Sequence, residues 1–146
     1  QILRAAGFTV LGPSTYDGLF GMLEKGRIDF FPRSVVEIWN EINEYQGELI
    51  AVEQHTALYY PAAMYYFVNK ENQGLYQAIV TGLELAIADG SFDQLFYRVH
   101  QPLIEKANLT ERRIFKLNNP VLPDNTPLHQ SSLWYQLPVG NLVESR

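Results

Sequence analysis

Cysteine is missing from the 146-residue chain, and charge is scarce, with Asp, Glu, Lys and Arg making up 18% of it. Without cysteine, disulfides, thiolate catalysis and cysteine-bound metal are excluded. Charged residues usually make up about 25% of a globular domain, and a low fraction argues against a disordered segment. The net charge of −5 disfavours nucleic acid or an anionic membrane surface as the main partner.

Long apolar runs and metal-ligand patterns are also missing. The longest apolar run, residues 58–68, is interrupted by Pro61 and is too short to span a bilayer. The three histidines, His55, His100 and His129, lie far apart, and no pair has the i, i+4 spacing of a metal site. No nucleophile elbow, phosphate-binding loop or dinucleotide-binding glycine motif occurs. The sequence therefore predicts no metal and no cofactor.

What is present is an alternation of short apolar segments and helical patterns. Strands are predicted at residues 8–11, 28–31 and 49–52. Amphipathic helices are predicted at residues 16–25 and 34–46. Such alternation with short loops favours an α/β layer with a mostly parallel sheet flanked by helices.

Local signals mark where these helices begin and end. Ser14 stands three residues before Asp17, and Ser34 stands three residues before Glu37, which is the spacing of a capping box. Residues 1–6 have the pattern of the last turns of a helix that Gly7 ends. A chain that starts inside a helix is predicted to be a fragment.

The middle of the chain is rich in tyrosine and predicts two strands that meet at a bend near Pro61, because proline is disfavoured in a central strand. A long helix is predicted over residues 75–88, and a second begins at Ser91. Pro102 should end or kink this second helix. Beyond residue 118, prolines among polar residues predict an irregular tail.

Four motifs in a fixed order suggest a family. They read GPST at residues 12–15, LEKGRID at 23–29, FVNK at 67–70 and ADGSF at 88–92. In this order they resemble the C-terminal half of bacterial extracellular solute-binding proteins of the amino-acid-binding type, family 3, over about residues 8 to 99. The continuation through residues 112–120 looks like a separate branch of that family.

The resemblance implies the type II periplasmic binding protein fold, in which two α/β lobes close over a ligand. Residues 1–55 would belong to the second lobe and residues 56–61 to the hinge crossing. Residues 62–117 would be the C-terminal part of the first lobe, so the chain would hold one lobe plus part of the other. Residues 118–146 would form the Pro-rich tail. The resemblance also implies a periplasmic location and an ABC permease as a possible partner.

The first candidate ligand site is the turn that holds Ser14, Thr15 and Tyr16. A helix N-terminus attracts a carboxylate because its N–H groups are unpaired. In the family, this turn binds the carboxylate of the ligand. The alternative is a plain N-cap, since Ser and Thr caps are common.

The second candidate is the loop with Arg33 and Ser34, where the family usually carries an Asp that pairs with the ligand's ammonium. Arg33 could bind an acidic group through its guanidinium fork, or it could be a solvated arginine. Tyr60 is a third candidate, because tyrosines near a cleft suit small ligands, although most of the tyrosines are expected in the core or hinge. A solvated helix face is indicated by the helical spacing of Glu37, Glu41 and Glu44.

These observations predict a non-catalytic module that captures a small polar ligand, amino acid-like or an organic acid, for uptake or sensing. The alternatives are an enzyme on the same fold, such as a cyclohexadienyl dehydratase or a domain attached to a lytic transglycosylase, and a sensor input domain. The apolar stripe of residues 62–117 would be exposed in a lone monomer. The chain is therefore expected to dimerise, to swap elements or to bind a missing N-terminal piece.

Overall fold

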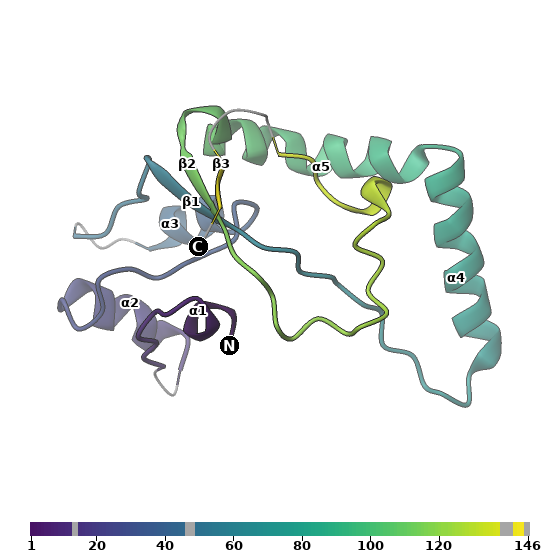
Figure 1. Ribbon diagram of the computed structural model, residues 1–146, viewed down its shortest axis with the longest axis horizontal. Helices are drawn as coiled ribbons and strands as arrows, with labels where there is room; N and C mark the ends of the chain where they lie inside the picture. Colours follow the sequence, from purple (N-terminus) through teal and green to yellow (C-terminus); the bar gives the residue numbers. More distant parts are fainter. Residues whose placement is uncertain (13–14, 46–48, 138–141, 145–146) are drawn as a thin grey trace.

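A small parallel sheet lies at the centre of the computed structural model, which describes residues 1–12, 15–45, 49–137 and 142–144 (Figure 1). Its strands are β1 (Thr56–Tyr59), β2 (Arg113–Lys116) and β3 (Leu142–Glu144), in the order β1-β2-β3. Both neighbouring pairs are parallel, with Thr56 opposite Arg113 and Ile114 opposite Leu142. A mixed α/β fold with a parallel sheet flanked by helices is thus confirmed.

The helices divide into two groups around this sheet. The described helices are α1 (Ile2–Ala5), α2 (Asp17–Glu24), α3 (Ile38–Glu44), α4 (Gln73–Ala88) and α5 (Ser91–Ala107), with short 3-10 turns at Leu109–Glu111 and Ser131–Leu133. In Figure 1, α1, α2 and α3 gather at one end of the molecule, α4 stands at the other end, and α5 connects α4 to the sheet. The predicted helices over 16–25, 34–46 and 75–88 are found, with shifted boundaries.

Helix α1 ends where the sequence predicts. Gly7 adopts φ +87°, a left-handed conformation that suits glycine. The N–H of Gly7 donates to the carbonyl of Arg4, and the N–H of Phe8 donates to the carbonyl of Leu3, both at 3.0 Å. This is the Schellman arrangement, which satisfies the last carbonyls of a helix.

The predicted strands at 8–11, 28–31, 49–52 and 62–68 are wrong, because none of these segments forms a strand in the structure. Short apolar runs become strands only when a partner strand is present, and periodicity cannot supply the partner. Here the first two runs meet through side chains instead, with the rings of Phe8 and Phe30 edge to face at 5.8 Å. The strand predicted before the bend is confirmed, because Thr56–Tyr59 form β1.

Two further elements differ from the prediction. Strand β3 lies inside the predicted irregular tail, and Pro102 lies inside α5, which continues to Ala107. The distal half of α5 is held by tertiary contacts, since the indole N–H of Trp39 donates to the carbonyl of Leu103 at 3.1 Å. Packing of this end therefore outweighs the hydrogen bond that Pro102 cannot make.

The core lies where the C-terminal end of α5 meets β1 and β2. Ala107, Leu109 and Ile114 form a buried cluster, and partly buried side chains from α3, β1 and the 135–137 segment surround it. Helix α4 has no part in this core, because none of its residues is buried. The buried residues are thus concentrated beside the sheet, and α4 contributes none of them.

Candidate functional site

The structure brings together two of the residues predicted to bind ligand. The guanidinium carbon of Arg33 lies 5.3 Å from the centre of the Tyr16 ring and 5.4 Å from that of Phe31. These distances are within the range of cation–π attraction. Tyr16 precedes α2 and Arg33 precedes α3, so the segments that lead into the N-terminal ends of two helices meet here.

An aromatic cluster of Tyr16, Phe20, Phe31 and Tyr45 supports this meeting point. Phe20 occupies its centre, with ring distances of 5.5 Å to Tyr16, 5.6 Å to Phe31 and 4.9 Å to Tyr45. The first two contacts are edge to face and the third is stacked, which are the arrangements that aromatic pairs prefer. The cluster therefore holds α2, the 31–33 loop and the end of α3 as one unit.

Arg33 is bound by two carboxylates, one on α3 and one on the residue just before it. Its Nε donates to Oε2 of Glu41 at 2.7 Å, and its Nη2 donates to Oε1 of the same carboxylate. Nη2 also lies 3.1 Å from Oε2 of Glu37. This is a bidentate fork, the strongest geometry that a guanidinium makes with a carboxylate. Arg33 and Glu41 are both partly buried, because their side chains are only 25% and 19% exposed.

The pairing changes the acid–base properties of the group. The hydrogen bond from Arg33 lowers the pKa of Glu41, and the same bond raises the pKa of Arg33. Burial raises the pKa of Tyr16, and the neighbouring carboxylate of Glu41 adds to this effect. The site therefore holds one fixed positive charge beside two carboxylates, and its local balance is negative.

The hydroxyl groups of the two loops act as local caps. Oγ1 of Thr15 accepts from the N–H of Gly18 at 3.3 Å, and Oγ of Ser34 accepts from the N–H of Val36 at 3.4 Å. The predicted capping box of Ser34 and Glu37 is wrong, because Glu37 pairs with Arg33 and α3 begins only at Ile38. Ser14, and with it the other predicted capping box, lies outside the described residues.

Tyr60 is not part of this group. It follows β1 directly, is half-buried, and has no ring contact with the aromatic cluster among the residues that the structure describes. The pairing of Glu41 with Arg33 was not predicted, because the helical spacing of Glu41 and its neighbouring glutamates indicates a solvated face. A signal was present, because Glu37 and Glu41 are one helical turn apart and Arg33 precedes Glu37 by the same interval.

A second feature is an apolar pocket of about 180 Å³ against the sheet. Its lining comes from β1, β2, α5 and the segments beside them: Val35, Val36, Ala57, Leu58, Tyr59, Phe96, Ile104, Leu109, Ile114, Tyr135 and Leu137. Several of these side chains also border the core. With so few polar groups, the pocket can hold a small apolar group but cannot orient a polar one.

A third feature is a buried arginine that links the C-terminal end of α5 to the start of β1. Arg112 donates from Nε to the carbonyl of Ala107 at 2.5 Å, and from Nη1 to the carbonyls of Glu53 at 2.6 Å and Thr56 at 3.1 Å. The Glu53 carboxylate accepts from the hydroxyl and N–H of Thr56, both at 2.6 Å, and from the N–H of His55 at 2.7 Å. These bonds, led by that of the Thr56 hydroxyl, lower the pKa of Glu53 to about 2. This arrangement is structural, since each partner is a backbone or capping group.

Comparison with known proteins adds no identity: no family model, curated protein or solved structure matches the chain. In the described ranges, no three acidic or histidine side chains are placed to share a metal ion. None of the helices described is long and apolar enough to cross a membrane. The function is therefore argued from the site alone.

Proposed function

We propose that this chain is part of a non-catalytic solute-binding module that captures a small polar ligand, amino acid-like or an organic acid, for uptake or sensing. The proposal includes the type II periplasmic binding protein fold, a periplasmic location and an ABC permease as partner. It is supported by one observation above others. Two segments expected to touch the ligand meet where Arg33 lies against the ring of Tyr16.

The hydrogen bonds of Arg33 indicate which ligand chemistry the site suits. Glu41 and Glu37 engage Nε and Nη2, and within the described part of the chain Nη1 makes no ion pair with a carboxylate. A guanidinium has five N–H donors in a fixed fork, and the two on Nη1 remain for a ligand oxygen. The carboxylate of Glu37, whose side chain is 52% exposed, could accept from a ligand ammonium nearby. A small zwitterion would satisfy both groups.

The aromatic cluster would contribute an apolar surface beside the charged groups. Tyr16 is 46% exposed, so part of its ring faces solvent beside the guanidinium. An apolar ring face next to a few fixed polar groups is the usual composition of a small-ligand site. Because Glu41 holds Arg33 in place, little side-chain entropy would be lost when the ligand binds.

The test is isothermal titration calorimetry of the protein with a panel of L-amino acids, dicarboxylates and hydroxy acids. We expect saturable binding of at least one member, and loss of that binding in Arg33→Met. Arg33→Lys keeps the charge without the fork, so it should bind at least about tenfold more weakly while retaining the fold. Arg27→Met is the matched control, because Arg27 is exposed in the turn after α2.

The proposal is overturned if no member of the panel binds the wild type, or if Arg33→Met and Arg27→Met bind equally well. Circular dichroism of each variant distinguishes loss of binding from loss of structure. A variant that binds no ligand but retains the wild-type helical signal supports a direct role for Arg33.

A further inference from the structure

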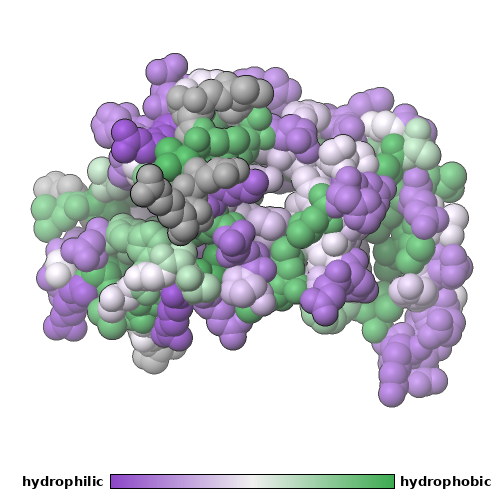
Figure 2. All heavy atoms as spheres, viewed as in Figure 1, coloured by the Kyte–Doolittle hydropathy of each residue, from purple (hydrophilic) through white to green (hydrophobic). Residues whose placement is uncertain are grey.

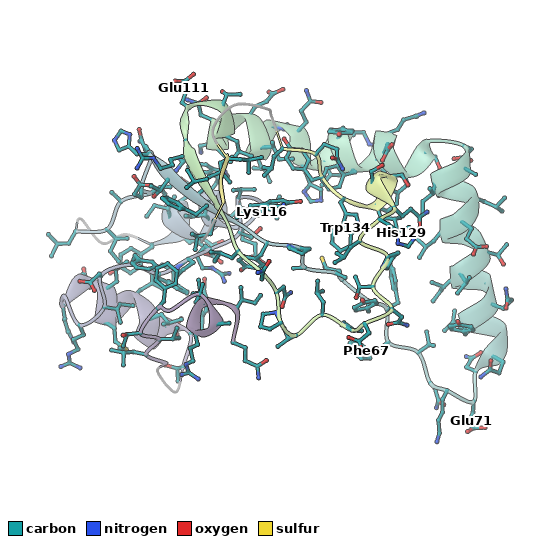
Figure 3. All side chains as sticks on the ribbon, viewed as in Figure 1. Phe67, Glu71, Glu111, Lys116, His129 and Trp134 are labelled. Atoms are coloured by element: carbon teal, nitrogen blue, oxygen red, sulfur yellow. The ribbon has the colours of Figure 1, made fainter. Side chains whose placement is uncertain are left out.

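An uncovered aromatic segment, residues 62–68, lies between the sheet and α4. Met64 is 98% exposed, Tyr65 58%, Tyr66 71% and Phe67 100%. Figure 2 shows hydrophobic atoms at the surface over this part of the molecule and over α4, and Figure 3 shows Phe67 at the lower edge between the sheet and α4. Soluble monomers rarely leave this much apolar side-chain surface open, so a partner is expected.

The backbone of this segment indicates what kind of partner fits. In the part of the chain that the structure describes, no N–H or C=O of residues 62–68 makes a hydrogen bond. The segment is held by two side-chain contacts. Just before it, Nδ2 of Asn119 donates to the carbonyl of Pro61 at 2.8 Å, and at its middle the Tyr65 hydroxyl lies 3.5 Å from Oγ1 of Thr126. An apolar segment with free backbone groups is completed by a strand, which supplies the missing hydrogen bonds, and not by a helix face.

We infer that the same segment of a second copy supplies this strand, as an antiparallel pair related by a two-fold axis at Tyr65. No charged residue occurs between Thr56 and Asn69, so two copies meet without like-charge repulsion. Centring the pair on Tyr65 places residues of the same face directly opposite each other. The opposed pairs are Ala62 with Val68, Ala63 with Phe67, and Met64 with Tyr66. In the first two of these, a small side chain faces a larger one.

The exposed aromatic side chains supply about half of the area that a standard interface covers. If a full aromatic side chain buries about 200 Å², then Tyr65, Tyr66 and Phe67 offer about 450 Å² at their exposed fractions. A standard interface covers about 800 Å² on each partner. The remainder must come from Met64 and from exposed side chains of α4, such as Leu75 and Tyr76, which follow closely in the chain. A symmetric pair of this kind closes on itself and stops at the dimer.

Because the chain has no cysteine, single-cysteine variants can test this geometry. In an antiparallel pair, opposed Cα atoms lie about 4.5–5.5 Å apart, which is within the range of a disulfide. Tyr65→Cys should therefore cross-link quantitatively to a dimer under mild oxidation. Tyr97→Cys is the matched control, since Tyr97 is a similarly exposed tyrosine on α5 and should cross-link slowly.

Charge variants test the same pair without oxidation. Tyr65→Lys and Tyr65→Glu each place like charges opposite each other, so each should raise the dimer dissociation constant about tenfold or more in sedimentation equilibrium. A one-to-one mixture of the two variants should restore the dimer, whereas Tyr97→Lys should leave it unchanged. The inference is overturned by a wild type that is monomeric at every concentration, by a dimer in which Tyr65→Cys does not cross-link, or by a mixture that stays monomeric.

Discussion

Replacing Arg112 by methionine should destabilise the fold more than any surface substitution of arginine. The side chain is buried and donates to three carbonyls, one of which belongs to Ala107, the last residue of α5. A helix leaves its final carbonyls without intrahelical partners, and a cation at this end is favourable. Arg112 therefore satisfies an acceptor that methionine, although similar in length, would leave buried and unpaired.

The size of the effect follows from these three bonds. A hydrogen bond to a charged group contributes about 1.5–3 kcal/mol, and an abandoned buried acceptor costs about 1–3 kcal/mol. Glu53 and Thr56 are exposed residues, so water can replace Arg112 at their carbonyls, whereas Ala107 is only 1% exposed. We therefore assign the full cost of a lost bond to the carbonyl of Ala107 and only a small cost to the other two carbonyls. The free energy of unfolding should fall by about 3 kcal/mol.

Urea unfolding at one fixed protein concentration, followed by tryptophan fluorescence, measures this loss. The next residue provides the control, because Arg113 is exposed on β2 and Arg113→Met should change stability by less than about 0.5 kcal/mol. Arg112→Lys should recover only part of the loss, since one ammonium cannot reach three carbonyls in a fixed fork. Equal stability of the Arg112→Met and Arg113→Met variants would refute the reasoning.

Three other substitutions test separate parts of the structure. The pKa of Glu53 is about 2 in the folded protein, below its unfolded value. The stabilisation by its carboxylate is therefore present above the unfolded pKa and is lost as pH falls toward 2. In Glu53→Gln, the melting temperature should depend less on pH between about pH 5 and 2.5 than it does in the wild type. Pro102→Ala gives the carbonyl of Arg98 a helical donor and should raise stability by about 1–3 kcal/mol in urea unfolding, and a loss would contradict this. Trp39→Phe removes the bond to the carbonyl of Leu103 and should cost about 1 kcal/mol by the same assay, whereas an unchanged midpoint would show that the bond is dispensable.

Local signals in the sequence predicted the helices well because their causes are local. The apolar stripe of α4 and the glycine after α1 depend on neighbours within one or two turns. One local signal was overlooked, since the side chain of Asn72 caps α4 by accepting from the N–H of Leu75 at 3.0 Å.

Strands were predicted poorly because a strand requires a distant partner. Residues 49–52 have the better strand composition, yet Arg113–Lys116, with charged residues at both ends, forms the middle strand. For the same reason, the candidate site was only partly foreseen. The position of Arg33 was singled out, but its bond to Glu41 depends on how the loop turns back on α3. The role of Arg112 had no sequence signal, because an arginine pair reads as surface charge.

The sheet order has a consequence for how the chain folds. Strand β1 pairs with a strand more than fifty residues later in the sequence, from Thr56 to Arg113, whereas α4 and α5 are adjacent in the sequence and contact each other where they join. Local contacts form faster than distant ones because less loop-closure entropy is lost. We therefore expect helices α4 and α5 to form in an early phase and the sheet in a later one. During that interval, the aromatic segment before α4 would be the part of the chain most prone to aggregation.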